Sequence, residues 1–397
     1  MKHTNRSRLL CLLLTLLLTL SLWTLTACEE VGEIADMLKV PSDTEKAPSG
    51  GTAKPKDTTA KPSDTTAPVT QKPGDVVVNG DLQIHFLELG NKYTGDCTYI
   101  KMGDMDVLID AGSKVSSIAT IDAYLSEYVT DGTLEYVIVT HAHEDHYAGF
   151  ATNEKTSSLF DLYECEVIID FAQITSSKAN QVMYNNYIRE RNDEIAAGAV
   201  HYTAKECMEQ NRSVFSLGEG TELRILDSYY YYNRSSTEND HSVCTMISQG
   251  DRHYLFTGDL EEKGEEKLVQ MNDLPRVTLY KAGHHGSKTS STTKLMEVIQ
   301  PEIICVCCCC GSSEYTQTAA NQFPTQAFID RVAPYTDRVY VTTLCIDYKQ
   351  GTYTSMNGNI VIHSNASGVT VTASANTTKL KDTAWFQANR ACPTAWK

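Results

Sequence analysis

The sequence concentrates metal-binding side chains in one short segment, residues 141–146, which reads HAHEDH. Its imidazoles and carboxylates would compete with one another unless a cation organised them, and they are the donors that suit Zn²⁺, Mn²⁺ and iron. His141 and His143 can point to one metal ion from an extended turn, while Asp145 and His146 can turn to a second. The segment therefore predicts a dinuclear centre, with two divalent cations about 3.5–4 Å apart that activate a bridging water.

A histidine-rich surface turn that binds metal only adventitiously is the alternative, and three further motifs count against it. Asp110 follows an apolar run in LIDAG, and Asp259 follows another in TGDL. His284 and His285 follow a third strand-like run, in HHGS. A single acidic residue at a strand end is often only a cap or a turn residue. Four strand ends that carry such groups in one chain favour one shared site.

The elements that must position these groups begin near residue 76, where short apolar runs start to alternate with helical patterns. Paired strands followed by strand and helix alternation predict an α/β fold with mixed sheets, in one domain of roughly 300 residues. We expect strands at 82–89, 97–102, 106–110, 136–140, 167–170, 223–226, 254–257, 277–281, 303–309, 339–344, 359–363 and 369–372. We expect helices at 115–128, 176–197, 261–271, 292–299 and 325–332.

With these motifs in this order, the sequence resembles the metallo-β-lactamase superfamily. Gly95-Asp96, the LFTGD that contains Asp259, the KAGHHGS run at 281–287 and the NQFP run at 321–324 are similar to the hydrolase domain of ComEC-type DNA-internalisation proteins. A set of surface phosphorylcholine esterases carries similar motifs. The resemblance covers about 82–371, and it implies an αββα sandwich of two mixed sheets flanked by helices that performs two-metal hydrolysis.

The resemblance also implies roles for the motif residues. His141 and His143 would bind the first metal ion, Asp145 and His146 would bind the second, and Asp259 would bridge the two. The pair would be two divalent cations, with Zn²⁺ first and Mn²⁺ or iron as alternatives.

One of His284 and His285 should complete the second metal site, because neighbouring residues at a strand end face opposite ways. The esterase comparison favours His285 as the ligand. His284 would then be catalytic together with Asp145, facing the leaving group or a phosphoryl oxygen. Asp110 is expected behind the ligands, where it would accept the second N–H of a ligand histidine.

The third histidine of the first metal site is where the sequence departs from the family, since no Gly-His-Thr motif precedes TGD. The candidate is His241, in NDHSV. It is either the missing ligand or a polar residue near the site, and a first site that lacked it would bind its metal ion more weakly.

The N-terminal residues have a pattern that predicts a targeting signal. Lys2, Arg6 and Arg8 precede a leucine-rich stretch that ends in LTAC at Cys28, which resembles a bacterial lipoprotein signal with Cys28 as the lipidated residue. A plain transmembrane anchor is the alternative, because the stretch is just long enough to span a bilayer. Both interpretations place the rest of the chain outside the cytoplasm, and the first tethers it to the extracellular face of the cell membrane.

The remaining chain divides by composition. Residues 29–78 are rich in Pro, Thr and Lys and predict a disordered linker, since they hold too few apolar side chains to offset the entropy of ordering. We expect the hydrolase domain at 79–375 and a C-terminal tail at 376–397.

The net charge of the chain limits the classes of substrate that it could bind. The formal net charge is −16, with a pI near 5.1, and removing residues 1–27 with their three basic residues leaves −19. This balance argues against a broad basic surface for long nucleic acid. A small phosphoester site stays possible, because bound metal ions supply local positive charge.

Two residue clusters have alternative interpretations. The run 305–310 reads CVCCCC, which predicts a buried core strand with Cys305, Cys307 and Cys309 on one face, against the alternative of a metal cluster. The four tyrosines at 229–232 could stack bases or cage a quaternary ammonium group, or pack in edge strands under a cap.

The sequence supports several hypotheses for the function of this chain. The first is a surface-anchored, metal-dependent phosphoesterase that acts on nucleic acid or on phosphoryl-alcohol groups of cell-wall polymers. Hydrolysis of β-lactams is a weaker third substrate class. A non-catalytic surface receptor is the alternative from another class, although a receptor has no need of a full two-metal ligand set.

Overall fold

The computed structural model describes residues 78–152 and 156–397. The predicted signal, Cys28 and most of the predicted linker lie outside these residues. None of the helices within the described ranges is long and apolar enough to cross a lipid bilayer.

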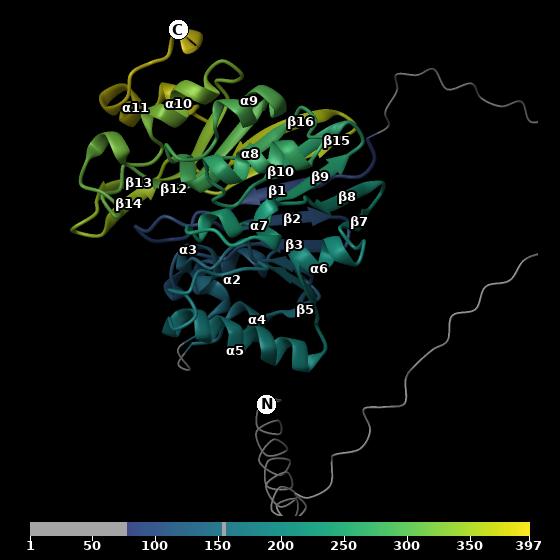
Figure 1. Cartoon of the computed structure of the whole chain (residues 1–397). Helices are drawn as coiled ribbons and strands as arrows, with labels where there is room; N and C mark the ends of the chain where they lie inside the picture. Colours follow the sequence, from purple (N-terminus) through teal and green to yellow (C-terminus); the bar gives the residue numbers. More distant parts are fainter. Residues whose placement is uncertain (1–77, 153–155) are drawn as a thin grey trace, which may run out of the picture. The chain divides into compact units, whose positions relative to one another are not determined.

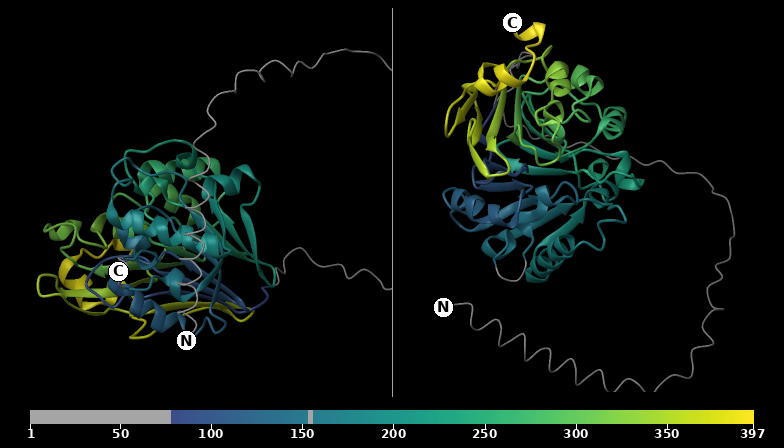
Figure 2. Two further views of the ribbon diagram at one scale, coloured as in Figure 1. Left: turned by 90° about the horizontal axis from the view of Figure 1, so that it is seen from below. Right: turned by 90° about the vertical axis from the view of Figure 1, so that its left-hand side faces the viewer.

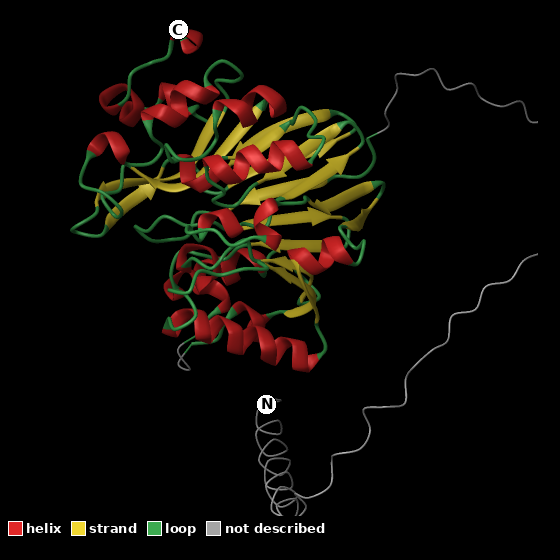
Figure 3. Ribbon diagram, viewed as in Figure 1, coloured by secondary structure: helices red, strands yellow, loops and turns green. Residues whose placement is uncertain are grey.

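Two mixed eight-stranded sheets form the centre of the described domain, which confirms the predicted fold class (Figures 1 and 3). The first sheet has the order β16-β15-β1-β2-β3-β4-β5-β6. Its strands are β1 (Leu82–Phe86), β2 (Thr98–Met102), β3 (Met105–Ile109), β4 (Thr133–Ile138), β5 (Glu164–Asp170), β6 (Val200–Thr203), β15 (Ile360–Asn365) and β16 (Gly368–Ala373).

The second sheet has the order β14-β13-β12-β11-β10-β9-β8-β7. Its strands are β7 (Val214–Gly218), β8 (Thr221–Ile225), β9 (Thr245–Gln249), β10 (Arg252–Phe256), β11 (Leu279–Lys281), β12 (Ile303–Cys310), β13 (Val339–Asp347) and β14 (Thr352–Ser355). In both sheets the central strands are parallel, β3 to β6 in the first and β10 to β13 in the second.

Helices cover the outer faces of the two sheets (Figure 1). The helices over the first sheet include α2 (Ile118–Leu125), α4 (Leu159–Leu162) and α5 (Val182–Ala197). Those over the second include α8 (Glu262–Met271), α9 (Thr293–Ile299) and α10 (Gln326–Val332). Shorter helices are α3 (Glu144–Tyr147), α6 (Ala204–Glu209), α7 (Tyr229–Tyr232) and α11 (Ala384–Asn389), and 3-10 turns lie at 115–117, 148–150, 239–241, 283–286, 319–321, 380–382 and 394–396.

Strand β12 shows how the layers are packed. Cys305 and Cys307 join the core that includes residues of the first sheet, while Cys308 and Cys310 pack against the outer helices. The whole strand is buried and all of its thiols are free, so it acts as an apolar core strand, as the sequence indicates. A small thiol packs much like a small hydrophobic side chain.

Three expectations about the elements need correction. The helix expected at 176–197 begins at Val182 instead, and the tyrosines at 229–232 form the short helix α7, not an edge strand. The C-terminal segment is not a free tail, because Leu380, Phe386 and Trp396 are buried against the second core. Figure 2 shows this yellow C-terminal part lying on the domain in both views.

Candidate metal centre

The four predicted motifs meet at the carboxyl ends of the central parallel strands. Asp110 directly follows β3, and its amide donates to the Ile138 carbonyl at the end of β4. The Val243 amide donates to the Thr140 carbonyl, and the His284 amide donates to the Gly258 carbonyl. Parallel strands end at one edge of a sheet, so these backbone bonds gather groups that lie far apart in sequence.

Asp259 lies at the centre of the cluster, with four imidazoles around one carboxylate oxygen. Its Oδ2 lies 3.2 Å from Nε2 of His146 and 3.3 Å from Nε2 of His285. The Nε2 atoms of His284 and His141 are 3.9 and 4.0 Å from the same oxygen. His141 is a predicted ligand of the first metal ion, and His146 and His285 are predicted ligands of the second, so Asp259 has contacts to both predicted sets. Its bridging role stays a prediction.

The HAHEDH segment contributes two adjoining donor sets. Nε2 of His141 lies 2.9 Å from Nδ1 of His143, so both imidazoles face the same space. Asp145 and His146 lie in the short helix α3, and Oδ2 of Asp145 lies 3.5 Å from Nε2 of His285. The described residues hold four groups with ligand atoms close enough to share a cation, and these are His141/His146/Asp259, Asp145/His146/His285, Asp96/Asp259/His285 and Asp96/Asp110/His146.

His285 and His284 differ in burial, although not for the reason that the sequence suggests. Both residues have left-handed backbone, with φ of 55° and 46°, so the alternation of a strand does not apply to them. His285 is buried, and its Nδ1 donates to the Cys307 carbonyl at 2.9 Å, which aims Nε2 at Asp259. His284 lies at the rim, where its Nδ1 is near Glu261 and Thr289.

Asp110 lies behind the cluster, where its predicted positioning role would place it. Its Oδ2 accepts from Nδ1 of His146 at 2.8 Å, and it also accepts from the amide and hydroxyl of Thr140. These bonds fix the His146 ring, so that its Nε2 points to Asp259.

Neither His143 nor His241, both predicted ligands, belongs to any of these four groups of described residues. His241 has other contacts. Its Nδ1 lies 3.2 Å from a carboxylate oxygen of Glu238, and its Nε2 accepts from the Ser235 amide at 3.1 Å. Both ring nitrogens therefore have protein partners, which favours the interpretation of a buried polar residue over that of a ligand. Among the other histidines outside the motifs, His85 contacts Tyr124 and His253 contacts Ser248.

Asp96 and Lys281 form a buried ion pair that sequence reasoning did not assign. Asp96 also lies 3.2 Å from Nδ1 of His285, and Lys281 donates to the Gly258 carbonyl. Both residues stand in the quoted GD and KAGHHGS motifs, which were the available signal. Their pairing could not be read from the sequence, because Gly95-Asp96 lies in a loop of the first sheet while Lys281 ends a strand of the second.

Electrostatics separate the histidines into two kinds. Burial lowers the pKa of His141 well below its usual value, and it also lowers the pKa of His143. Burial acts the same way on His146 and His285, but carboxylates led by Asp259 outweigh it and raise the pKa of both rings well above the usual value. Burial would raise the pKa of Asp259, yet the surrounding imidazoles, His285 first, hold it well below.

These residues fit a metal centre. The Nε2 atoms of His146 and His285 and the Oδ1 of Asp259 are buried without a hydrogen-bond partner of good geometry. Buried polar atoms left in this way carry a desolvation cost that a coordinated cation would remove. The donors are imidazole nitrogens and carboxylate oxygens, a set that suits Zn²⁺, Mn²⁺ or iron.

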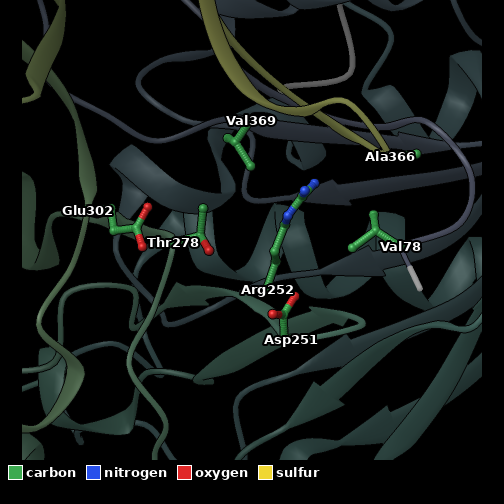
Figure 4. A pocket seen from close by; sticks show the side chains of 7 residues that line it. All are labelled: Val78, Asp251, Arg252, Thr278, Glu302, Ala366 and Val369. Carbon is green, nitrogen blue, oxygen red and sulfur yellow. The ribbon is translucent and has the colours of Figure 1, made fainter. Parts of the chain in front are cut away.

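Two surface cavities differ in their relation to this centre. The one in Figure 4, of about 530 Å³, is lined by residues such as Asp251, Arg252 and Glu302, at the strand ends opposite the cluster. Its Arg252 is already bonded to Ser364 and to the Asn365 carbonyl. The second, of about 480 Å³, shares Glu261 and Thr289 with the surroundings of His284, so it opens beside the centre. Glu261 and Thr289 therefore connect the second cavity to the surroundings of His284.

Residues 90–152 match the family described as "Metallo-beta-lactamase superfamily", and the two-sheet fold is the one that this resemblance implied. The chain is 25% identical over 226 residues to "Recombination protein 2" of Haemophilus influenzae, covering 56% of this chain and 24% of that protein. It is 22% identical over 174 residues to "ComE operon protein 3" of Bacillus subtilis, covering 43% of this chain and 19% of that protein. These matches confirm the resemblance to the competence-protein branch of the superfamily.

The chain spans about a quarter or less of the length of these curated relatives. Among solved structures, the metallo-β-lactamase fold protein YhfI from Bacillus subtilis is 10% identical with a TM-score of 0.38, covering 69% of this chain and 99% of that one.

Proposed function

We propose that this domain is a two-metal hydrolase that cleaves phosphoesters. The observation that carries the proposal is the placement of Asp259, whose single Oδ2 lies 4.0 Å from His141 of the first predicted set and 3.2 and 3.3 Å from His146 and His285 of the second. A carboxylate placed in this way can be shared by two cations. Divalent cations held by such a set supply Lewis-acid polarisation and lower the pKa of coordinated water.

The residues around the cluster would do the rest of the work. Asp110 fixes His146, and the Cys307 carbonyl fixes His285, so the donors are oriented before a substrate arrives. Asp96 of the buried Asp96–Lys281 pair contacts Nδ1 of His285, while Asp259 contacts its Nε2. Such preorganisation is what electrostatic stabilisation of a developing charge requires. His284, at the rim with a partly exposed side chain, is placed to contact a leaving group or a phosphoryl oxygen.

Nucleic acid is the first substrate class. The names of these relatives, "Recombination protein 2" and "ComE operon protein 3", support it. The net charge of −16 counts against a broad grip on long duplexes, so we expect the domain to act on short or single-stranded segments.

The cavity beside His284 favours a second candidate. It is lined by Tyr230 and by the acidic residues Asp240, Glu261 and Glu262, together with Arg234 and Lys263. An aromatic ring with acids close by suits a cationic alcohol, as in a phosphorylcholine-type group on a cell-wall polymer. The mixed charge of this cavity is the reason to test both classes.

The test is turnover by the metal-loaded, full-length protein on bis(p-nitrophenyl) phosphate, a single-stranded oligonucleotide and p-nitrophenyl phosphorylcholine. We expect release of p-nitrophenol by the wild-type chain and its loss in Asp259→Asn. Cleavage of the oligonucleotide would support the first class, and selective cleavage of the choline ester the second. A metal-loaded protein that cleaves none of the three would contradict the proposal.

We also propose that the chain is held at the extracellular face of the membrane through a lipid on Cys28. The support is the basic start, the leucine-rich stretch and the LTAC sequence. Mass spectrometry of the mature N-terminal peptide should show a diacylated Cys28. An unprocessed N-terminus in the membrane fraction would favour the transmembrane anchor instead.

A further inference from the structure

Tyr315 is an exposed residue whose hydroxyl group touches the metal centre. Its side chain is 56% exposed, yet its hydroxyl donates to Oδ2 of Asp145 at 2.6 Å. The same Oδ2 lies 3.5 Å from Nε2 of His285. The phenol therefore lies on the solvent side of the donor set, where a substrate must approach.

The loop that carries Tyr315 is fixed on both sides. The neighbouring Glu314 accepts a hydrogen bond from the Thr94 amide at 2.8 Å. Farther along, Arg390 donates to the carbonyls of Gln322 and Pro324 at 2.7 and 3.0 Å. A hydroxyl held by an anchored loop needs little reorganisation to meet a ligand.

Aromatic contacts connect Tyr315 to the histidines of the metal centre. The rings of Tyr315 and Phe323 have centroids 5.7 Å apart, and Phe323 lies 5.8 Å from the ring of His284 and 5.9 Å from that of His285. Tyr315 is therefore packed against the same wall that carries the rim histidine.

The nearby buried donors are already occupied. Lys281 is paired with Asp96, and Nδ1 of His285 donates to the Cys307 carbonyl. The hydroxyl of Tyr315 differs, because its hydrogen-bond partner, Asp145, is itself a predicted ligand of the second metal ion. A carboxylate that gives its lone pairs to a cation is a weaker acceptor, which leaves the phenol proton for another oxygen.

We propose that Tyr315 is a substrate-contacting residue, which donates its phenol hydrogen bond to a non-bridging phosphoryl oxygen of the substrate. This inference rests on the proposed phosphoesterase function and names a group that binds the substrate there. A hydrogen bond from a neutral donor to an anionic oxygen is among the stronger ones in proteins.

The test compares Tyr315→Phe with wild-type, metal-loaded, full-length protein in two measurements, the Kd for inorganic phosphate by calorimetry and turnover of bis(p-nitrophenyl) phosphate. We expect the variant to bind phosphate about 10- to 100-fold more weakly and to lose kcat by a similar factor. Its metal content should equal that of the wild type. Tyr232→Phe is the matched control, because Tyr232 is also exposed and donates to a carboxylate, that of Asp227, outside the centre.

The outcomes separate this inference from the proposed function. Unchanged phosphate binding in Tyr315→Phe would overturn it, and so would a loss of metal ions that accounts for the whole effect, since Tyr315 would then only position Asp145. Wild-type protein that binds phosphate without turnover would contradict the phosphoesterase, while the contact would still be decided by the variant's Kd. Wild-type protein that binds no phosphate would overturn the inference directly.

Discussion

Asp259 and the imidazoles around it set the chemistry of this centre. Oδ2 of the carboxylate faces two buried rings within 3.3 Å, and its charge helps to raise the pKa of both. Without cations, protons on these rings balance the carboxylates. A divalent cation must displace such protons from the nitrogens that it binds, so metal binding and proton release are coupled.

Asp110→Asn tests the support of His146. An amide can accept in place of one carboxylate oxygen, but its NH₂ group faces donors that now lack an acceptor, Nδ1 of His146 and the Thr140 hydroxyl. We expect metal affinity to fall about 10- to 100-fold without loss of the fold. Competition with a chromophoric chelator measures this.

The control for Asp110→Asn is Asp227→Asn, whose carboxylate accepts from Tyr232 outside the centre. An Asp110→Asn protein with wild-type metal affinity would show that Asp110 has no part in holding the ligand.

The motif residues could be predicted because four strand ends of one chain carry imidazoles or carboxylates, a combination that a cap or a turn at a single strand end does not explain. Asp96 and Tyr315 were not assigned roles, since one acidic residue in a loop and one exposed tyrosine carry no signal of their own. The choice of His285 as the ligand came from the esterase resemblance and stays a prediction, while the strand rule used for the pair does not apply to their left-handed backbone. His241 shows the limit of spacing, which cannot reveal that Glu238 and Ser235 occupy its nitrogens.

At the scale of elements, the parallel strands that precede the motifs were predictable, because buried apolar runs mark central strands. The expected runs at 136–140 and 303–309 correspond to β4 and β12, with ends that shift by a few residues. Strands β6, β7 and β14 were missed because they are short or partly exposed, so their patterns are weak, and β9 was missed although four of its five residues are buried. Tyrosine favours strands on propensity alone, but tertiary context placed 229–232 in a helix.

Glu265 ties α8 to the loop that precedes α9, and it gives a pH prediction. It is buried and accepts from the amides of Ser291 and Thr292 at 2.5 and 2.7 Å. Burial raises its pKa from 4.5 to about 7, against these hydrogen bonds and Arg331. The folded protein then binds more protons than the unfolded chain between these two pH values, so the free energy of unfolding falls as pH rises through that window, by about 3 kcal/mol.

Glu265→Gln removes this titration. We expect the difference in unfolding free energy between wild type and variant, measured by urea unfolding with chelator present, to shift against the wild type from pH 4.5 to 7. Glu266→Gln, at an exposed neighbour, should keep the wild-type slope across this window. A constant difference between wild type and Glu265→Gln would show that Glu265 titrates normally.

At the scale of the whole molecule, the C-terminal segment packs against the core on the outer side of the second sheet. Trp396 is buried, contacts the ring of Phe386 and donates its indole N–H to the Thr336 carbonyl at 2.8 Å. The composition of 376–397 gave little sign of this packing, because only a few of its residues are large and apolar.

Trp396→Ala should therefore destabilise the domain by about 3 kcal/mol, while Trp396→Phe should keep most of the packing and lose about 1 kcal/mol with the hydrogen bond. Urea unfolding of the metal-loaded chain measures both, and metal content should not change in either. Equal stability of Trp396→Ala and wild type would mean that the segment is not part of the core.

We infer that two cations are held around Asp259, and the number of metal ions bound per chain decides this. Full-length protein should be purified without chelator, dialysed against Zn²⁺ or Mn²⁺ at neutral pH, and analysed by inductively coupled plasma mass spectrometry beside Asp259→Asn and the control Asp227→Asn. We expect two tightly held metal ions per chain in the wild type and the control, and one or none in Asp259→Asn. A wild-type chain that retains no metal ion, or an Asp259→Asn chain that retains two, would contradict it.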